Sequence, residues 1–259
     1  MRLRLRFAKV DKVRFTSHRD VARIVERTLR RADLPVAFTE GFSPRPKLHF
    51  GLALPTAYES LGEFIEVDLR PDDAADVDLD TLPARLSDLL PPGMVVTDAG
   101  AVDRSGPSLQ QAVVACSWWV AVVGQDEAAL VASLDDLLAR PEVMVTRERK
   151  GKQVTDDIRP SIERVAVVPD APALPLPAVV AADLGEDAVV PPAGAVVVEM
   201  VLAAQPRAVR PAEVLAVVDP ALEERRVVRQ SQWMVLDGAR HELGSAAATR
   251  AVLAEVRAS

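Results

Sequence analysis

The chain has 259 residues, a formal net charge of −7 and a hydrophobic content of 49%, which is ordinary for a soluble globular protein. Its single cysteine, Cys116, excludes an internal disulfide and any metal or iron–sulfur site built from several thiolates. No apolar stretch reaches the roughly 20 residues that a membrane span requires. The N-terminal "MRLRLRFAKV" also lacks the continuous apolar segment of a signal peptide. These features predict a cytoplasmic protein that does not enter a membrane.

The first half alternates strands and helices. Period-two alternation in "RLRLRFAKV" predicts a half-buried strand over residues 2–10. Apolar residues spaced by three and four predict a helix that begins at Thr16 or Ser17 and ends before Pro35. Further strands are expected over 36–40, 48–55, 62–70 and 94–102, with a short helix within 78–93. The order is that of a split βαβ, ferredoxin-like unit with one added hairpin.

The same order of elements recurs after a linker at 103–111. We expect strands at 112–124, 194–204 and 226–238, helices at 126–142 and 210–219, and one or two strands within 143–162. The prediction is an α+β protein of two tandem ferredoxin-like halves with antiparallel sheets, similar to RRM and RAMP folds. The domains would be 1–102 and 112–240, with a Pro/Ala-rich insertion at 169–194, followed by a tail at 241–259 that is either helical or disordered.

Charge is distributed unevenly along the chain. Residues 1–50 carry 13 Lys/Arg against 5 Asp/Glu, whereas residues 51–140 carry 4 against 16. Two interpretations stay open: an electrostatic footprint for an anionic partner, or a solvated helix face together with strand ends.

The loop "GFSPRPK" at 41–47 is the most unusual local motif. Arg45 offers a planar donor fork for phosphate and Lys47 a point charge, while Pro44 and Pro46 restrict the backbone. We expect this loop to face "TSHRD" at the start of the first helix and to form an anion site with it. The alternative is a rigid turn in which Arg45 pairs with Glu40 or Glu59.

His18 is the candidate for catalysis. It lies at a helix start near Arg14 and Arg19, and could act as a general acid or base in RNA cleavage. A capping, packing or hydrogen-bonding role is the alternative. No pair of histidines has metal-ligand spacing, so no metal and no cofactor are expected.

A second basic cluster surrounds Gly151 in "RERKGKQ". We interpret Lys150 and Lys152 as a second nucleic-acid contact, although a charged hairpin tip is often only solvated. The following Asp156 and Asp157 could bind a cation, but we expect them to form salt bridges with one of the nearby arginines: Arg147, Arg149 or Arg159.

The long stretch from "RLRFAKVDKVRFTSHRD" through "GFSPRPKLHFGLALP" to "GEFIEVDL", with the later "KGKQVTDDIRPSI", resembles the radical-SAM-linked family DUF2344. The resemblance implies a partner in trans, a radical-SAM protein with a cobalamin-type domain, because this chain lacks the cysteine triad of a radical-SAM cluster. The tandem halves and the His at a helix start are also similar to RAMP-type CRISPR RNA-processing proteins.

These observations predict a non-catalytic accessory protein that binds RNA and presents it to the radical-SAM partner. One alternative is a metal-independent endoribonuclease that uses His18, and another is a protein-interaction module that binds no RNA. The residues expected to bind nucleic acid are Arg14, His18, Arg19, Arg45, Lys47, Lys150 and Lys152.

Overall fold

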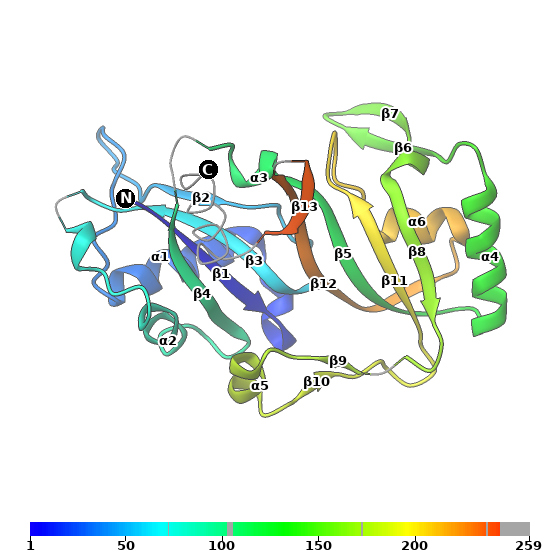
Figure 1. The fold of residues 1–259 in the computed structure, drawn as a ribbon. Helices are drawn as coiled ribbons and strands as arrows, with labels where there is room; N and C mark the ends of the chain where they lie inside the picture. Colours follow the sequence, from blue (N-terminus) through cyan, green and yellow to red (C-terminus); the bar gives the residue numbers. More distant parts are fainter. Residues whose placement is uncertain (72, 103–105, 172, 237, 244–259) are drawn as a thin grey trace. The chain divides into compact units, whose positions relative to one another are not determined.

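The computed structural model of the chain describes residues 1–71, 73–102, 106–171, 173–236 and 238–243. The chain divides into two compact units (Figure 1). Unit 1 contains residues 1–112, 176–187 and the described residues from Met234 onward, and unit 2 contains residues 113–175 and 188–233. The segment 176–187, which lies inside the expected insertion, therefore belongs to unit 1.

Unit 1 has the β-α-β-β-α-β order of the predicted ferredoxin-like unit, without the extra strand expected at 36–40. Its main elements are β1 (Arg2–Lys9), α1 (His18–Arg31), β2 (Leu48–Phe50), β3 (Glu59–Asp68), α2 (Leu82–Ser87) and β4 (Met94–Val102). Its smaller elements are 3-10 turns at Asp11–Phe15 and Ala74–Asp76, the helices α3 (Leu109–Ala112) and α5 (Ala178–Leu184), and β13 (Ala239–Glu242). The strands lie in the order β4-β1-β3-β2, and every neighbouring pair is antiparallel. This confirms the ferredoxin-like prediction for the first half.

The core of unit 1 lies between one face of this sheet and the helices α1 and α2. Leu3, Leu5 and Phe7 of β1 are buried on that face, as the period-two pattern predicts. The buried stripe of α1 and the leucines of α2 belong to the same apolar cluster, so both helices cover the same face. Ser17 caps α1 as expected, because its side chain accepts the backbone N–H of Asp20 at 3.2 Å.

Unit 2 repeats the architecture. Its main elements are β5 (Val113–Val123), α4 (Glu127–Ala139), β8 (Ile162–Val168), β11 (Val196–Ala203), α6 (Pro211–Val218) and β12 (Glu223–Leu236), of which the residues up to Trp233 belong to unit 2. The strand order β12-β5-β11-β8 matches that of unit 1, element for element. The second ferredoxin-like half is thus confirmed, and α4 and α6 lie near each other beside its sheet (Figure 1).

Two additions interrupt unit 2. An antiparallel hairpin, β6 (Met144–Arg149) and β7 (Lys152–Asp157), lies between α4 and β8. The segment after β8 contains a two-stranded sheet of β9 (Leu174–Pro175) and β10 (Ala188–Val189), on either side of α5. Within unit 1, Asp183 of α5 accepts the backbone N–H of Gly93 at 2.8 Å. The described part of the Pro/Ala-rich insertion therefore contains two short strands, a helix and a defined contact.

Two sequence-based expectations were wrong in detail, and one strand was missed. Residues 36–40 form two isolated bridges, Val36 to Leu69 and Phe38 to Pro46, and no strand, because prolines lack the N–H that would extend the ladder. The strand expected over 48–55 ends at Phe50. The edge strand β8 was not predicted as a strand, although "IERVAVV" is rich in β-branched residues. Of the expected tail, residues 244–259 lie outside the described part of the chain.

Candidate nucleic-acid interface

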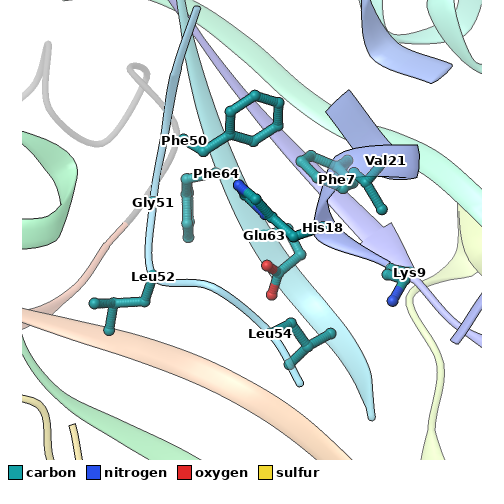
Figure 2. Close-up of a pocket in the computed structure, with 10 residues that line it drawn as sticks. All are labelled: Phe7, Lys9, His18, Val21, Phe50, Gly51, Leu52, Leu54, Glu63 and Phe64. Carbon is teal, nitrogen blue, oxygen red and sulfur yellow. The ribbon is translucent and has the colours of Figure 1, made fainter. Parts of the chain in front are cut away.

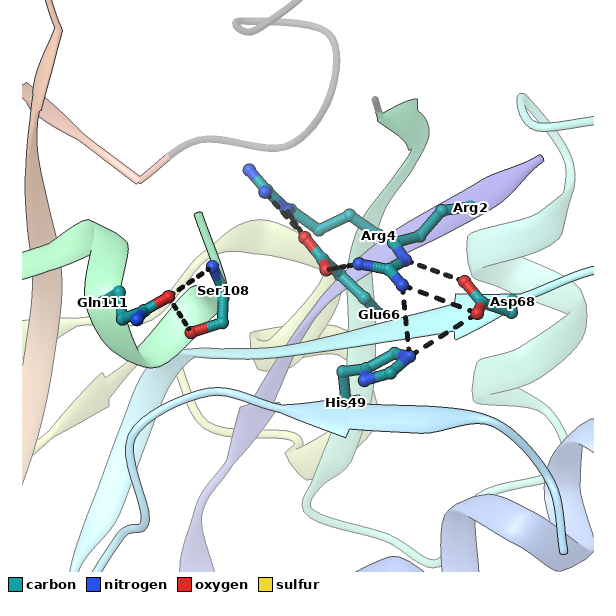
Figure 3. A network of polar contacts seen from close by, with 7 residues as sticks. All are labelled: Arg2, Arg4, His49, Glu66, Asp68, Ser108 and Gln111. Atoms are coloured by element: carbon teal, nitrogen blue, oxygen red, sulfur yellow. Dashed lines mark hydrogen bonds and ion pairs between the residues drawn. The ribbon is translucent and has the colours of Figure 1, made fainter. Parts of the chain in front are cut away.

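Arg2 and Arg4 of β1 are part of an internal ion-pair network (Figure 3). Arg4 donates from Nε and Nη2 to Oε1 of Glu66, at 3.0 and 2.7 Å. Arg2 contacts the other oxygen of Glu66 at 3.3 Å and Oδ1 of Asp68 at 2.7 Å. His49 of β2 lies 3.6 Å from Asp68. The strands of the ferredoxin-like sheet thus neutralise part of the basic N-terminal segment, and these charges are not available to a partner.

The exposed face of α1 carries a different set of arginines. The buried stripe of α1 faces the core, and the opposite side is solvent-exposed. Because residues three or four apart share a helix face, five exposed guanidinium groups follow one another along this side: Arg19, Arg23, Arg27, Arg30 and Arg31. Within the described part of the chain, four of the five have no ion pair, and Arg23 pairs with Asp20 at 3.3 Å. We call these five residues the arginine row.

Residues 38–47 form a short finger-shaped loop. The backbone N–H of Thr39 donates to the carbonyl oxygen of Arg45 at 2.9 Å, and the N–H of Arg45 donates back to the Thr39 hydroxyl at 3.0 Å. The bridge between Phe38 and Pro46 closes the base. Phe42 and Arg45 are exposed, and neither Glu40 nor Glu59 pairs with Arg45 among the described residues. The ion-paired turn considered from the sequence is therefore absent. We call residues 38–47 the finger.

The finger borders the C-terminal half of α1. One groove is lined by residues of both segments and by Arg70, namely Glu26, Leu29, Arg30, Asp33, Leu34, Val36, Phe38, Pro46 and Arg70. The expectation that the finger faces "TSHRD" was wrong, for a topological reason. Strands β1 and β2 run parallel on either side of β3, so α1 begins where β2 ends, while the finger precedes the start of β2. The helix start and the finger lie at opposite ends of this strand.

His18 instead lines a small cavity at the N-terminal end of α1 (Figure 2). Its ring meets that of Phe50 edge-on, with centroids 4.9 Å apart. Two charged side chains from the sheet, Lys9 and Glu63, line the same cavity. The remaining walls are Phe7, Val21, Gly51, Leu52, Leu54 and Phe64. An imidazole, a carboxylate and an ammonium group in one cavity are groups that can transfer protons or orient a polar ligand.

Sequence reasoning did not select Lys9 and Glu63, although one signal was present. Glu63 occupies the same face of β3 as Leu61 and Ile65, in a position where the alternation predicts an apolar residue. Lys9 is 3% exposed, and its ammonium group donates to the carbonyl oxygens of Arg14 and Thr16, each at 3.1 Å. A charged residue on the core-facing side of a strand was the signal.

Arg14, one of the predicted phosphate ligands, is partly engaged within unit 1. Its guanidinium lies 3.8 Å from the fully buried carboxylate of Glu59 and 4.6 Å from the ring centre of Phe15. Arg19, by contrast, is exposed at the start of the arginine row. Lys47 is half-buried at the base of the finger.

In unit 2, Lys150 and Lys152 are exposed at the tip of the β6–β7 hairpin. The expected salt bridge at its base is present, because Arg147 contacts Asp156 at 3.1 Å, and Arg207 contacts the same carboxylate at 3.0 Å. The carboxylate of Asp157 instead accepts two backbone N–H groups, which hold its pKa below the ordinary value.

Among the described residues, no group of three or more His, Cys, Asp and Glu side chains is arranged to hold a metal ion. Cys116 is buried in β5. The helices within the described ranges include none with the length and apolar character of a membrane span.

Comparison with known proteins gives a family and a distant structural likeness. No curated protein matches the chain. A chain in a solved structure titled "Crystal Structure of a Cbf5-Nop10-Gar1 Complex" is similar over 89% of the present chain, with a TM-score of 0.45 and 8% sequence identity. The present chain spans about half, 48%, of that chain. A family model described as "Uncharacterized protein conserved in bacteria (DUF2344)" matches residues 2–211, so the chain belongs to this family.

Proposed function

We propose that this chain is an RNA-binding accessory protein that presents RNA to a radical-SAM partner enzyme. The observation that carries the RNA-binding part is the arginine row on α1, which continues toward the finger across their shared groove. The row extends over about 18 Å, at 1.5 Å per residue. Guanidinium groups bind phosphate through two donors at once, which makes such a row suited to a nucleic-acid backbone.

The distribution of charge supports an external anionic partner. The protein carries a net charge of −7, yet unit 1 neutralises Arg2 and Arg4 internally and leaves the arginine row in solvent. Exposed like charges along one helix repel one another and lower helix stability. The arginine row is therefore better explained as a surface that binds a polyanion than as a contribution to the stability of the fold.

RNA affinity measured against salt concentration tests this proposal. Each phosphate contact with a single strand contributes about 0.7 to the slope of log K against log salt. Replacing Arg27 and Arg30 together by alanine should reduce the slope by about 1.4. Arg140→Ala is the matched control, since Arg140 is an exposed arginine at the end of α4 and should leave the slope unchanged. Absence of RNA binding at about 50 mM salt would refute the proposal.

The radical-SAM partner is the part of the proposal that rests on the family resemblance. Its support is indirect, since a chain with one cysteine cannot supply three thiolates for a radical-SAM cluster. Co-purification with the reconstituted partner tests it: the partner's iron–sulfur absorbance should elute with this chain on size exclusion. Separate elution at micromolar concentrations, with and without RNA, would refute the partnership.

The cavity around His18 favours one second candidate, a metal-independent endoribonuclease. Lys9 and Glu63 line the same cavity as His18, so the cavity wall contains three titratable side chains. If the chain cleaves RNA, His18→Ala should reduce the rate about 10²- to 10⁴-fold while RNA binding persists. His241→Ala, at an exposed position of β13, is the matched control. We expect no cleavage by the unsubstituted protein, and cleavage lost only with His18→Ala would instead establish the enzyme.

A further inference from the structure

Phe42 is the most exposed large apolar side chain of the described residues. Its relative exposure is 110%, against 4% for Phe7 and 3% for Phe64 in the core. The chain is poor in aromatic residues, at 4%. Burying a phenylalanine side chain normally stabilises a fold, and the exposed Phe42 ring makes no such contribution. Its position is better explained by a ligand than by folding.

The finger holds Phe42 away from the core on a closed base. The two hydrogen bonds between Thr39 and Arg45 and the bridge at Phe38 restrain the loop on both sides. Pro44 restricts the backbone beyond the tip. A side chain displayed on a restrained loop loses less conformational entropy on binding than one on a flexible loop.

The neighbours of Phe42 indicate which kind of ligand it meets. Arg45, three residues further along, is exposed and has no ion pair with a described residue. Phe38, 50% exposed, lies at the base of the finger and lines the groove with Arg30 of the arginine row. Aromatic faces beside cationic groups match single-stranded RNA, whose unpaired bases stack on rings while the backbone contacts cations. An apolar protein pocket would satisfy the ring but leave the arginines without partners.

We infer that Phe42 stacks on an unpaired base of single-stranded RNA, with Arg45 on the adjacent phosphate. The inference rests on the proposed RNA binding and specifies its substrate class, single strands in preference to duplexes. A base pair inside a duplex exposes no ring face to a loop tip, whereas every unpaired base does. Selection of single strands thus follows from the geometry of the tip.

The experiment compares one mixed-sequence RNA oligonucleotide, single-stranded and as a duplex, by fluorescence anisotropy. Removal of a stacking aromatic weakens binding by about 5- to 150-fold. Phe42→Ala should show this loss for the single strand and leave the duplex affinity unchanged. Phe42→Trp should retain the affinity, and its indole fluorescence should be quenched by the single strand. Phe42→Leu should not restore the affinity, because leucine is apolar but cannot stack.

Val190→Ala is the control, since Val190 is an exposed apolar residue of unit 2, and should change neither affinity. The inference is overturned if Phe42→Ala binds the single strand as well as the unsubstituted protein, or if Phe42→Leu restores full affinity. In both cases the unsubstituted protein still binds RNA, so the proposed function survives. Failure of the unsubstituted protein to bind either RNA overturns both.

Discussion

The buried network of unit 1 leads to a quantitative prediction for Glu66→Gln. The Glu66 side chain is 4% exposed, and it is the carboxylate that neutralises Arg4, whose side chain is 9% exposed. Arg2 keeps its contact with Asp68 at 2.7 Å, so the loss falls mainly on Arg4. Removing one partner of a buried ion pair typically costs about 3–5 kcal/mol, because the other charge stays buried. We expect the free energy of unfolding of unit 1 to fall by about 3 kcal/mol, because the glutamine oxygen still accepts one hydrogen bond from Arg4.

Amide hydrogen exchange, read by mass spectrometry, measures this loss in unit 1 alone. A loss of about 3 kcal/mol should speed the slowest amides of β1 and β3 by about two orders of magnitude. The three tryptophans, Trp118, Trp119 and Trp233, all belong to unit 2 and report on that unit separately by fluorescence. The two readouts together locate the destabilisation.

Two comparison variants make the reasoning refutable. Asp73→Asn breaks an exposed pair with Arg70, whose side chains are 51% and 61% exposed, and should cost less than about 1 kcal/mol. Replacing Arg4 by methionine together with Glu66 by leucine should cost less than Glu66→Gln, because no buried charge is left unpaired. A loss for Glu66→Gln as small as that of Asp73→Asn would refute the assignment of Arg4 as a buried, internally neutralised charge.

Four further predictions concern single residues or the composition of the chain. Gly93→Ala should destabilise unit 1 by about 2 kcal/mol or more in thermal unfolding. The reason is that Gly93 has φ +87° and that an added Cβ would lie 2.4 Å from the carbonyl oxygen of Val10. Gly106→Ala is the control and should be neutral, because a Cβ added at Gly106 meets no atom within 4 Å. Asp157→Asn should lower Tm at neutral pH, because it removes the ionised carboxylate that the two backbone N–H groups stabilise. The pKa of Asp157 in the folded protein lies below its ordinary 3.8, so the carboxylate loses this stabilising effect as pH falls through the folded pKa. The difference in Tm between the two proteins should therefore vanish in acid. Arg45→Ala should weaken RNA binding by about 1–3 kcal/mol without changing Tm, and Arg45→Lys should restore only part of it; a lower Tm with unchanged RNA affinity would indicate a structural role instead. After anaerobic reconstitution with iron and sulfide, the purified chain should be colourless, and stoichiometric iron would contradict the accessory role.

Local patterning was sufficient to predict most of the elements of both units. Apolar residues alternate around Leu5 and recur every three or four positions around Val25, because one side of each element packs on a core. These two periods can be read from the sequence alone, without knowing which element packs against which. The cap at Ser17 is equally local, because donor and acceptor are three residues apart. The repeated order of elements then indicated two ferredoxin-like halves, since this order with short connections permits few topologies.

The tertiary structure alone decided which charges are available to a partner. Arg4 meets Glu66 because β1 and β3 are adjacent and antiparallel, and no local pattern relates residues 62 positions apart. The same pairing brings Lys9 and Glu63 to the cavity of His18, and the parallel course of β1 and β2 separates His18 from the finger. Strand register, a property of long-range packing, therefore decided which arginines of the basic N-terminal segment are neutralised by internal ion pairs.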